Sequence, residues 1–313
     1  MSDLWNGKVS PSLEEDHPSP GITTILEPVD KDLGGFVVRR LLPAAARKRI
    51  GPFVFFDHLG PVAFPPGAGV DIRPHPHIGL ATVTYLLEGE IVHRDSLGKQ
   101  QTIRANEINL MTAGRGISHS ERTGFELRKE GHRLHALQLW VALPAKQERC
   151  APDFHHYDAN RLPTLEQDGV SIRLLIGAAF GLQSEVRTFS KTLFVDVTLE
   201  AGASLTLPGD IEERAVYLIA GSAQARGHHL DPHRMTIFDP DKEVTIKAAQ
   251  EARLVIIGGN SIGKRTVWWN LVASDRALIE QAKRDWSSGR FPMVPGETEF
   301  IPLPTEQLCT ESA

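Results

Sequence analysis

The chain has 313 residues, of which 41% are hydrophobic and 23% charged, and its formal net charge at pH 7 is −5. This composition is typical of globular proteins, and the length predicts two domains of roughly 150 residues each. The negative balance, without a basic stripe, argues against direct contact with nucleic acid, because phosphate binding needs clustered lysine and arginine.

The first twenty residues, MSDLWNGKVSPSLEEDHPSP, are polar and acidic, unlike the basic and then apolar start of a signal peptide. No stretch approaches the roughly eighteen uninterrupted apolar residues of a membrane-spanning helix. We therefore expect a cytoplasmic protein with no membrane partner and with an N-terminal arm outside its folded domains. Cys150 and Cys309 lie far apart and in no CxxC pair, which does not favour a disulfide framework.

From Ile22 to about Leu143, short apolar runs recur between turn signals, and few helical patterns interrupt them. This spacing predicts an antiparallel sandwich or barrel. The runs are TTILEP, GFVVRRLLP, FVFFDHLG, ATVTYLLEG, EIVHRDSLG, EINLMTAGRG and LHALQLWVALP.

A polar stretch, PAKQERCAPDFHHYDANRLP, interrupts this rhythm, and similar strand-like runs resume after it. The second half thus repeats the pattern of the first, and its YLIAGS echoes YLLEGE, as expected after a duplication. We expect an all-β protein with one domain in residues 1–147 and another in residues 148–313.

One segment, SDRALIEQAKRDWSSG, has a convincing helical pattern near the C-terminus. Ser274 and Asp275 offer an N-cap and a first-turn acid, and Gly289 suits a left-handed stop. A buried stripe is predicted for Leu278, Ala282 and Trp286.

The segment DIRPHPHIGLATVTYLLEGEI holds His75 and His77 two residues apart, so both side chains point the same way on an extended chain. Pro74 and Pro76 favour extended backbone in the residues before them. Because proline cannot donate a ladder hydrogen bond, the pair belongs at a sheet edge or a barrel mouth.

A second pair, His119 and Glu121, stands in TAGRGISHSE, where Gly114 and Gly116 suit a sharp start to a strand. Two such pairs on different strands of one barrel can converge to give three imidazoles and a carboxylate. Ligands of this kind, without thiolate, suit iron(II), nickel, manganese, copper or zinc. The structural alternative is a set of polar rim residues, with His119 hydrogen-bonded to Glu121.

The two motifs HPHIGLATVTYLLEGEIVHRDSLG and INLMTAGRGISHSE resemble the signature of the pirins, a bicupin family of the cupin superfamily. The resemblance is close over roughly residues 35–145. It is looser in the second half, where the strand rhythm and the closing WWNLVASDRALIEQAKRDW carry it. It implies two tandem cupin-type β-sandwich or barrel domains with a short C-terminal helix.

By this resemblance, the metal ligands are His75, His77, His119 and Glu121, with iron(II) the expected metal. Thr82 occupies the position of the general cupin glutamate, as in pirins, which take their acidic ligand from the His-x-Glu pair.

Other features of the family pattern bear on the substrate and on the second domain. Ala81 replaces an acidic residue found in many pirins, which affects the expected substrate preference. The second domain of such bicupins is usually metal-free, and we expect the same here although it contains His228, His229 and His233.

Other polar and aromatic candidates have competing interpretations. His93 and Asp95 could orient a ligating imidazole, but a solvent-facing hairpin is the favoured interpretation. His132 and His135 are interpreted as surface or packing residues. Core packing is favoured over a role as pocket walls for the aromatic residues Phe53, Phe55, Phe56 and Tyr85.

The resemblance implies a metal-dependent dioxygenase, similar to quercetin 2,3-dioxygenase, that acts on quercetin-like flavonols or related phenolic enols together with dioxygen. Glu121 is the candidate catalytic residue, since it could accept the substrate proton as well as ligate the metal. Two alternatives stay open: a non-enzymatic iron protein whose redox state controls binding to a protein partner, and a zinc or manganese isomerase.

Overall fold

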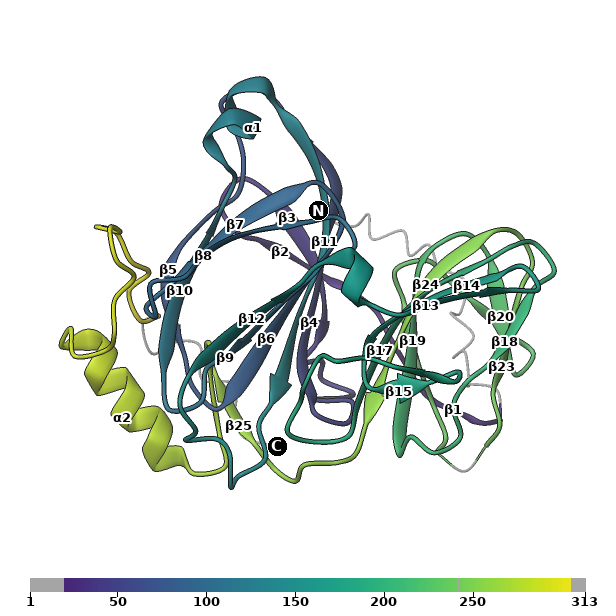
Figure 1. The fold of residues 1–313 in the computed structure, drawn as a ribbon. Helices are drawn as coiled ribbons and strands as arrows, with labels where there is room; N and C mark the ends of the chain where they lie inside the picture. Colours follow the sequence, from purple (N-terminus) through teal and green to yellow (C-terminus); the bar gives the residue numbers. More distant parts are fainter. Residues whose placement is uncertain (1–19, 241, 305–313) are drawn as a thin grey trace, which may run out of the picture.

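Two antiparallel β-domains lie side by side, each with a seven-stranded and a four-stranded sheet, and a C-terminal helix lies beside the first domain (Figure 1). The computed structural model describes residues 20–240 and 242–304. The N-terminal arm expected for the first twenty residues, apart from Pro20, and Cys309 lie outside the described residues. Within them, the all-β prediction with two cupin-type domains and a short C-terminal helix is confirmed.

The first domain has a large sheet in the order β12-β9-β6-β11-β4-β3-β2 and a small sheet in the order β5-β10-β7-β8. Neighbouring strands in both sheets are antiparallel. The large sheet contains β2 (Val29–Asp32), β3 (Val37–Leu42), β4 (Phe53–Phe64), β6 (Leu80–Glu88), β9 (Ile108–Thr112), β11 (His132–Ala142) and β12 (Asp153–Tyr157). The small sheet contains β5 (Asp71–His77), β7 (Glu90–Asp95), β8 (Gln100–Arg104) and β10 (Ile117–Arg122), and the short helix α1 (Phe125–Glu130) follows it.

The second domain repeats this plan, with a large sheet in the order β1-β22-β19-β24-β17-β14-β13 and a small sheet in the order β18-β23-β20-β21. The large sheet contains β1 (Ile22–Leu26), β13 (Thr164–Gln167), β14 (Val170–Ile176), β17 (Thr192–Leu199), β19 (Glu213–Ala220), β22 (Met235–Phe238) and β24 (Ala252–Gly259). The small sheet contains β18 (Ser204–Thr206), β20 (Ala223–Ala225), β21 (His228–Leu230) and β23 (Thr245–Ala248). The remaining elements are a 3₁₀ turn (Ala159–Arg161), β15 (Ala178–Ala179) with β16 (Leu182–Gln183), β25 (Thr266–Trp268) with β26 (Leu271–Ala273), and the helix α2 (Arg276–Ser287).

The two large sheets pack against each other and bury a common core. Along β6, Ala81, Val83 and Tyr85 face this shared core, whereas Thr84 faces the interior of the first domain. Strand β6 is therefore buried on both faces, which explains its nearly continuous apolar sequence. The hydroxyl of Tyr85 donates to Asp196 Oδ2 across the interface at 2.6 Å, so this buried polar group is paired.

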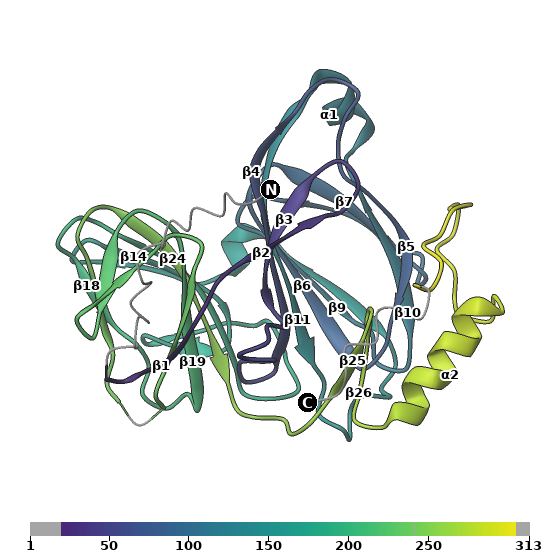
Figure 2. The same ribbon diagram turned by 180° about the vertical axis from the view of Figure 1, so that it is seen from behind.

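Both ends of the described chain cross between the two halves. Strand β1 pairs with β22 and so completes the large sheet of the second domain. At the other end, Leu271 of β26 forms a bridge with Ile78, and α2 packs beside β5 and β10 of the first domain (Figure 2). The boundary near residue 147 stays a prediction, and these elements cross it.

Helix α2 follows its predicted signals with two exceptions, the first being that it starts one residue later than predicted, so that Asp275 and not Ser274 is the N-cap and the first turn has no acidic residue. Asp275 is the N-cap and its carboxylate accepts a hydrogen bond from the amide of Ala277, while Gly289 adopts a φ of +69° after the helix. Ala282 and Trp286 are buried as predicted. The prediction is wrong for Leu278, which is only partly buried, because the stripe that faces the sheet runs through its neighbour, and the buried set is Ile279, Ala282 and Trp286.

Neither α2 nor α1 is long and apolar enough to cross a bilayer, and the same holds for every helical segment in residues 20–240 and 242–304. Helix α1 was not predicted, since it buries none of its residues and so has no apolar stripe in its sequence. The cytoplasmic location stays a prediction.

Candidate metal centre

The two predicted pairs lie on neighbouring antiparallel strands of the small sheet. His119 of β10 is opposite His75 of β5, and Glu121 is opposite Ile72. Two residues separate His75 and Ile72 on β5, whereas only one separates His119 and Glu121, so β5 carries a bulge at this point. Pro74 lies within the bulge, a position that needs no N–H donor for the ladder, so proline fits there.

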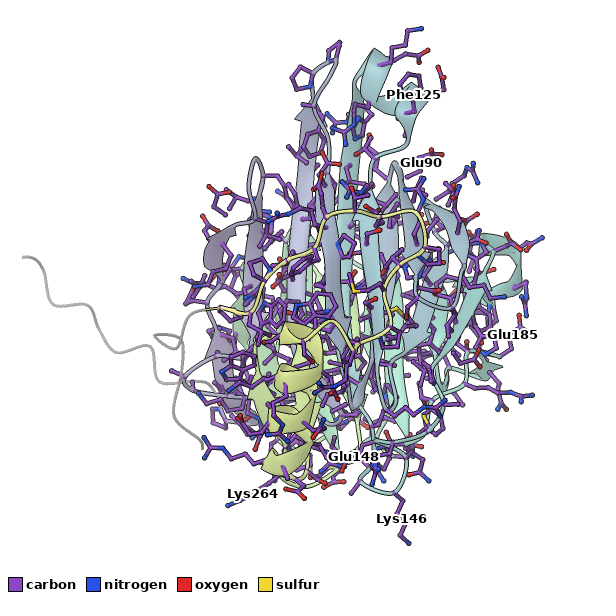
Figure 3. The ribbon with its side chains drawn as sticks, turned by 90° about the vertical axis from the view of Figure 1, so that its left-hand side faces the viewer. Glu90, Phe125, Lys146, Glu148, Glu185 and Lys264 are labelled. Atoms are coloured by element: carbon purple, nitrogen blue, oxygen red, sulfur yellow. The ribbon has the colours of Figure 1, made fainter. Side chains whose placement is uncertain are left out.

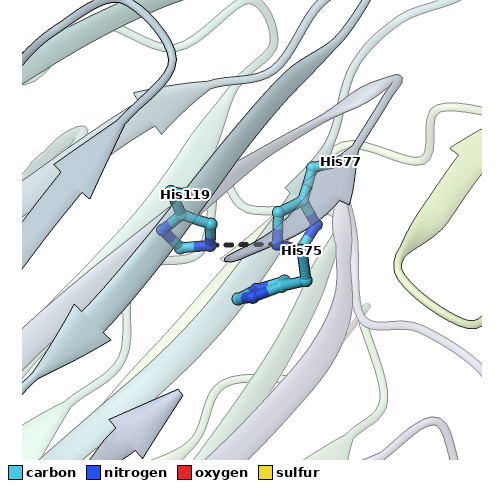
Figure 4. Close-up of side chains that lie close together, drawn as sticks. All are labelled: His75, His77 and His119. Carbon is cyan, nitrogen blue, oxygen red and sulfur yellow. Dashed lines mark hydrogen bonds between the residues drawn. The ribbon is translucent and has the colours of Figure 1, made fainter. Parts of the chain in front are cut away.

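The structure brings three of the four predicted ligands together (Figure 4). Nitrogen atoms of His75, His77 and His119 all lie within 4.8 Å of one another, and the three side chains are buried. The Nε2 atoms of His77 and His119 are 3.1 Å apart. Glu121 is also buried and lines the same pocket, but it lies outside this closest group.

Hydrogen bonds to the main chain fix the proton position on two of the rings. His75 Nδ1 is 2.9 Å from the carbonyl of Arg73, and His77 Nδ1 is 3.0 Å from the carbonyl of Asn270. Because a carbonyl can only accept, each Nδ1 carries the proton, and each Nε2 of the neutral ring presents a lone pair.

Burial also keeps these rings neutral. It lowers the pKa of His75 to about 4, and it lowers the pKa of His77 and of His119 well below the usual 6.5, with neighbouring imidazoles adding to the effect. Unprotonated nitrogen atoms that converge within a few ångströms repel one another unless a cation lies between them. The donor set therefore fits a divalent transition metal.

The three histidines open into a pocket of about 300 Å³ with mainly apolar walls. Phe55 and Trp140 form one wall as a stacked pair, with ring centroids 4.0 Å apart and an interplanar angle of 11°, and Trp140 also contacts His77 edge-on. Phe55 packs in a buried apolar cluster, as the favoured prediction has it, and it is a pocket wall as well. The predicted core role is confirmed for the others, which lie in the interdomain core: Phe53, Phe56 and Tyr85.

A polar pair on the pocket wall was missed by the sequence reasoning. The guanidinium of Arg40 binds Asp57 through two hydrogen bonds of 2.7 and 2.8 Å and lies over the ring of Phe55. Burial raises the pKa of Asp57, and the hydrogen bonds and charge of Arg40 oppose this rise. The available signals were a charged residue within the apolar run FVFFDHLG and two arginines within GFVVRRLLP.

The favoured interpretation of His93 and Asp95 as part of a solvent-facing hairpin is wrong. Their side chains are only 3% and 0% exposed, and they pair with each other through a 3.0 Å contact between His93 Nε2 and Asp95 Oδ2. The reason is that β12, which extends the large sheet, places Phe154 in a stack over the His93 ring, at 4.4 Å between centroids.

The segment that follows α2 contributes to the same region. The amide of Ile301 donates to the carbonyl of Pro74 on β5, and Glu297 accepts hydrogen bonds from Ser120 and Arg122, on either side of Glu121. Figure 3 looks onto this side, where the segment crosses the strands above α2. Near the start of the helix, Glu148 accepts hydrogen bonds from the amide and hydroxyl of Ser274.

The histidines of the second domain do not form a comparable cluster. In the described parts of the chain, the groups of three or more metal-binding side chains are the triad in the first domain and a partly exposed set made up of Glu107, His156 and Asp158. His233 lies at the domain interface, with its ring 5.6 Å from that of His58. A metal-free second domain stays a prediction.

Comparison with known proteins agrees with this architecture. The Pirin family model matches residues 35–141, and the model of the pirin C-terminal cupin domain matches residues 194–292. The chain belongs to the pirin family. This confirms the resemblance that the two histidine motifs carry.

Named relatives match over most of their length. A pirin-like protein of Caulobacter vibrioides is 47% identical over 88% of this chain and 96% of its own. A Pseudomonas aeruginosa protein named "Putative quercetin 2,3-dioxygenase" is 38% identical over 82% of this pirin and 80% of its own chain. A crystal structure of quercetin 2,3-dioxygenase from Acinetobacter baumannii, 34% identical, superposes with a TM-score of 0.83 over 90% of this chain and 95% of its own.

Proposed function

We propose that this pirin is a metal-dependent dioxygenase that acts on quercetin-like flavonols or related phenolic enols. The main observation in support is that three neutral imidazoles converge, next to a buried carboxylate, in a pocket with a stacked aromatic wall. The substrate class is supported by the relatives that are named quercetin 2,3-dioxygenase.

The proposed metal ligands are the Nε2 atoms of His75, His77 and His119 and the carboxylate of Glu121. Iron(II) is the expected metal, and nickel, manganese, copper or zinc suit the same donors. Once bound, the metal would supply a Lewis acid for the substrate hydroxyl and a redox centre for the reaction with dioxygen.

Glu121 is the proposed base for the substrate hydroxyl. Burial raises the pKa of its carboxyl group, an effect opposed by His93 and by the hydroxyl of Thr84, so it is a stronger proton acceptor than an exposed glutamate. Thr84 Oγ1 lies 3.3 Å from Glu121 Oε1 and 2.9 Å from Gln138 Oε1. These contacts hold the carboxylate in the pocket, where it can receive the enol proton.

The pocket walls would bind and orient the planar substrate. The stacked Phe55 and Trp140 rings offer an aromatic surface, and the apolar lining excludes water from the reacting groups. Arg40 and Gln138 supply the polar contacts that phenolic hydroxyl groups need within such a pocket.

The test is dioxygen uptake by iron(II)-loaded protein incubated with quercetin, with product formation followed in parallel. We expect catalytic turnover that His119→Ala abolishes and that His229→Ala, at an exposed histidine of the second domain, leaves unchanged. Turnover no faster than that of free iron(II), or insensitive to His119→Ala, would contradict the proposal.

Two other results would point to the alternatives from the sequence. Metal binding without turnover, together with redox-dependent capture of a protein partner, would favour the redox-sensing role. Turnover without dioxygen uptake would favour the isomerase.

A further inference from the structure

A second histidine and a buried aspartate lie directly behind His119, on the neighbouring strand β7. In the antiparallel register, Asp95 is opposite His119 and His93 is opposite Glu121. His93 Nδ1 lies 3.4 Å from His119 Nδ1, and the other ring nitrogen of His93 contacts Asp95. A continuous chain therefore leads from Asp95 through His93 to a proposed metal ligand.

Asp95 decides the direction of the hydrogen bonds in this chain. Its Oδ1 accepts from the amides of Leu97 and Lys99, at 2.9 and 3.1 Å, and its Oδ2 faces His93 Nε2. An ionised carboxylate can only accept, so His93 Nε2 carries a proton and its Nδ1 is an acceptor. With a metal on the Nε2 side of the triad, His119 Nδ1 is then the donor to His93, and its Nε2, 3.1 Å from that of His77, presents its lone pair to the metal.

This mode of control is particular to His119. The other two rings are fixed by main-chain carbonyls, which no side-chain substitution removes. His119 has no such carbonyl partner, and its tautomer depends on side chains alone. The stacked ring of Phe154 holds the His93 plane in place between the two partners.

We infer that Asp95, acting through His93, is a positioning residue that fixes His119 as an Nε2 metal donor. The inference rests on the proposed metal ligation but not on dioxygenase activity. Partners of this kind typically change metal affinity about 10- to 100-fold when they are removed.

The sharpest test is Asp95→Asn, which replaces one carboxylate oxygen with an NH₂ group and keeps the shape of the side chain. The amide oxygen still accepts from Leu97 and Lys99, so the new NH₂ group faces His93 Nε2 and donates to it. The direction of the hydrogen bonds then reverses, because His93 Nδ1 becomes the donor to His119 Nδ1. The proton of His119 moves to Nε2, where the metal should bind. We expect nickel(II) or zinc(II) affinity to fall about 10- to 100-fold.

The chain offers a matched control in Asp153→Asn. Asp153 contacts His155 at 2.8 Å and is also two residues from its histidine, but both side chains are exposed and neither lines the pocket. The same chemical change there should leave metal affinity unaltered. A loss of metal affinity of equal size would show that the effect at Asp95 does not depend on its hydrogen bonds through His93 to His119.

The direct readout is the tautomer of His119, measured by long-range ¹H–¹⁵N NMR of the protein loaded with diamagnetic zinc(II), because without a metal the 3.1 Å contact with His77 Nε2 also draws a proton to His119 Nε2. We expect an Nδ1 proton in the unmodified chain and an Nε2 proton after Asp95→Asn. An Nε2 proton in the unmodified chain, or no change on substitution, would overturn the inference. Because this measurement needs no turnover, failure of the dioxygenase proposal would leave its result intact.

A double-mutant cycle separates positioning from a role in the turn. In a His93→Phe background the hydrogen bonds between Asp95 and His119 are interrupted. Adding Asp95→Asn should then change metal affinity by less than about twofold, as for residues that act only through each other. A full effect of Asp95→Asn in that background would mean that Asp95 acts through Leu97 and Lys99 instead, and the inference would fail.

Discussion

The imidazole of His77 is held by the main-chain carbonyl of Asn270, 193 positions later in the chain, at a distance of 3.0 Å. Asn270 stands between β25 and β26, so this hairpin supports one of the proposed ligands. The candidate metal centre of the first domain is therefore supported by the β25–β26 hairpin, which follows the second domain in the chain.

Gly79 provides a test of this support. It has a φ of +66°, and a Cβ atom there would overlap the carbonyl oxygen of Val272 in β26. We expect Gly79→Ala to displace the hairpin, lower the free energy of unfolding by more than about 2 kcal/mol and weaken metal binding. The control is Gly98→Ala, which has a similar φ of +79° and nothing within 4 Å of the new Cβ.

Urea unfolding and metal titration of both glycine variants would measure these effects. Gly98→Ala should lose only about 1 kcal/mol, the conformational part, and keep its metal affinity. Equal losses of affinity in both variants would contradict a supporting role for the hairpin.

Glu121→Gln should separate metal binding from proton transfer. The amide keeps an oxygen donor but accepts a proton poorly, so we expect kcat with quercetin to fall about 10²- to 10⁴-fold while the protein still binds about one metal ion. Metal analysis and dioxygen uptake on the same sample would check this. Glu88→Gln, at an exposed ion pair with Arg133, is the control and should keep full activity.

Phe55→Leu should weaken substrate binding through the loss of the stack on Trp140. Because such an aromatic pair contributes about 0.5–1.5 kcal/mol beyond its buried area, we expect KM for quercetin to rise about 2- to 10-fold, with a smaller change in kcat. Phe53→Leu, in the interdomain core, should lower stability without changing KM. A rise in KM in both variants would mean that the effect is general loosening.

The domain interface should make the metal-free protein sensitive to acid. His58 Nδ1 lies 2.6 Å from the hydroxyl of Tyr217 and its Nε2 lies 2.6 Å from His135 Nε2; burial lowers the pKa of His58 to about 2 and that of His135 to about 4. Between pH 6.5 and about 4 only the unfolded state takes up these protons, so the free energy of unfolding should decline as the pH falls.

His135→Gln isolates one part of this dependence, since the amide oxygen can still accept from His58. The slope of stability against pH between 6.5 and 4.5 should become shallower by at most about 1 kcal/mol per pH unit, less than the full 1.4 because His135 is partly exposed. Chemical denaturation at several pH values would measure it. An unchanged slope would show that His135 takes up no additional proton on unfolding.

The local part of the metal site follows directly from the sequence. His75 and His77, like His119 and Glu121, are spaced by two, and the period of an extended strand places each pair on one face. The prolines and glycines around them restrict the backbone in ways that the sequence displays. The strand rhythm likewise predicts the two β-domains, because turn residues and apolar runs are local signals.

The parts that were missed depend on contacts between distant segments. Asn270 acts through a main-chain carbonyl, so its side chain carries no signal. The burial of His93 depends on Phe154 of β12, a strand of the first domain that lies in the polar stretch where no strand was predicted. In the same way, the stripe of α2 passes through Ile279 because of where the helix rests on the first domain. Helical spacing alone does not fix that rotation.

Strand β1 precedes the whole first domain in the chain, yet its register pairs Ile22 with Phe238 in the second. During synthesis, β1 therefore leaves the ribosome long before its partner exists. Its backbone N–H and C=O groups have no strand partner until β22 emerges. Assembly of this protein cannot finish one half at a time, because the sheet that β1 borders is complete only after β22 and β24 have been made.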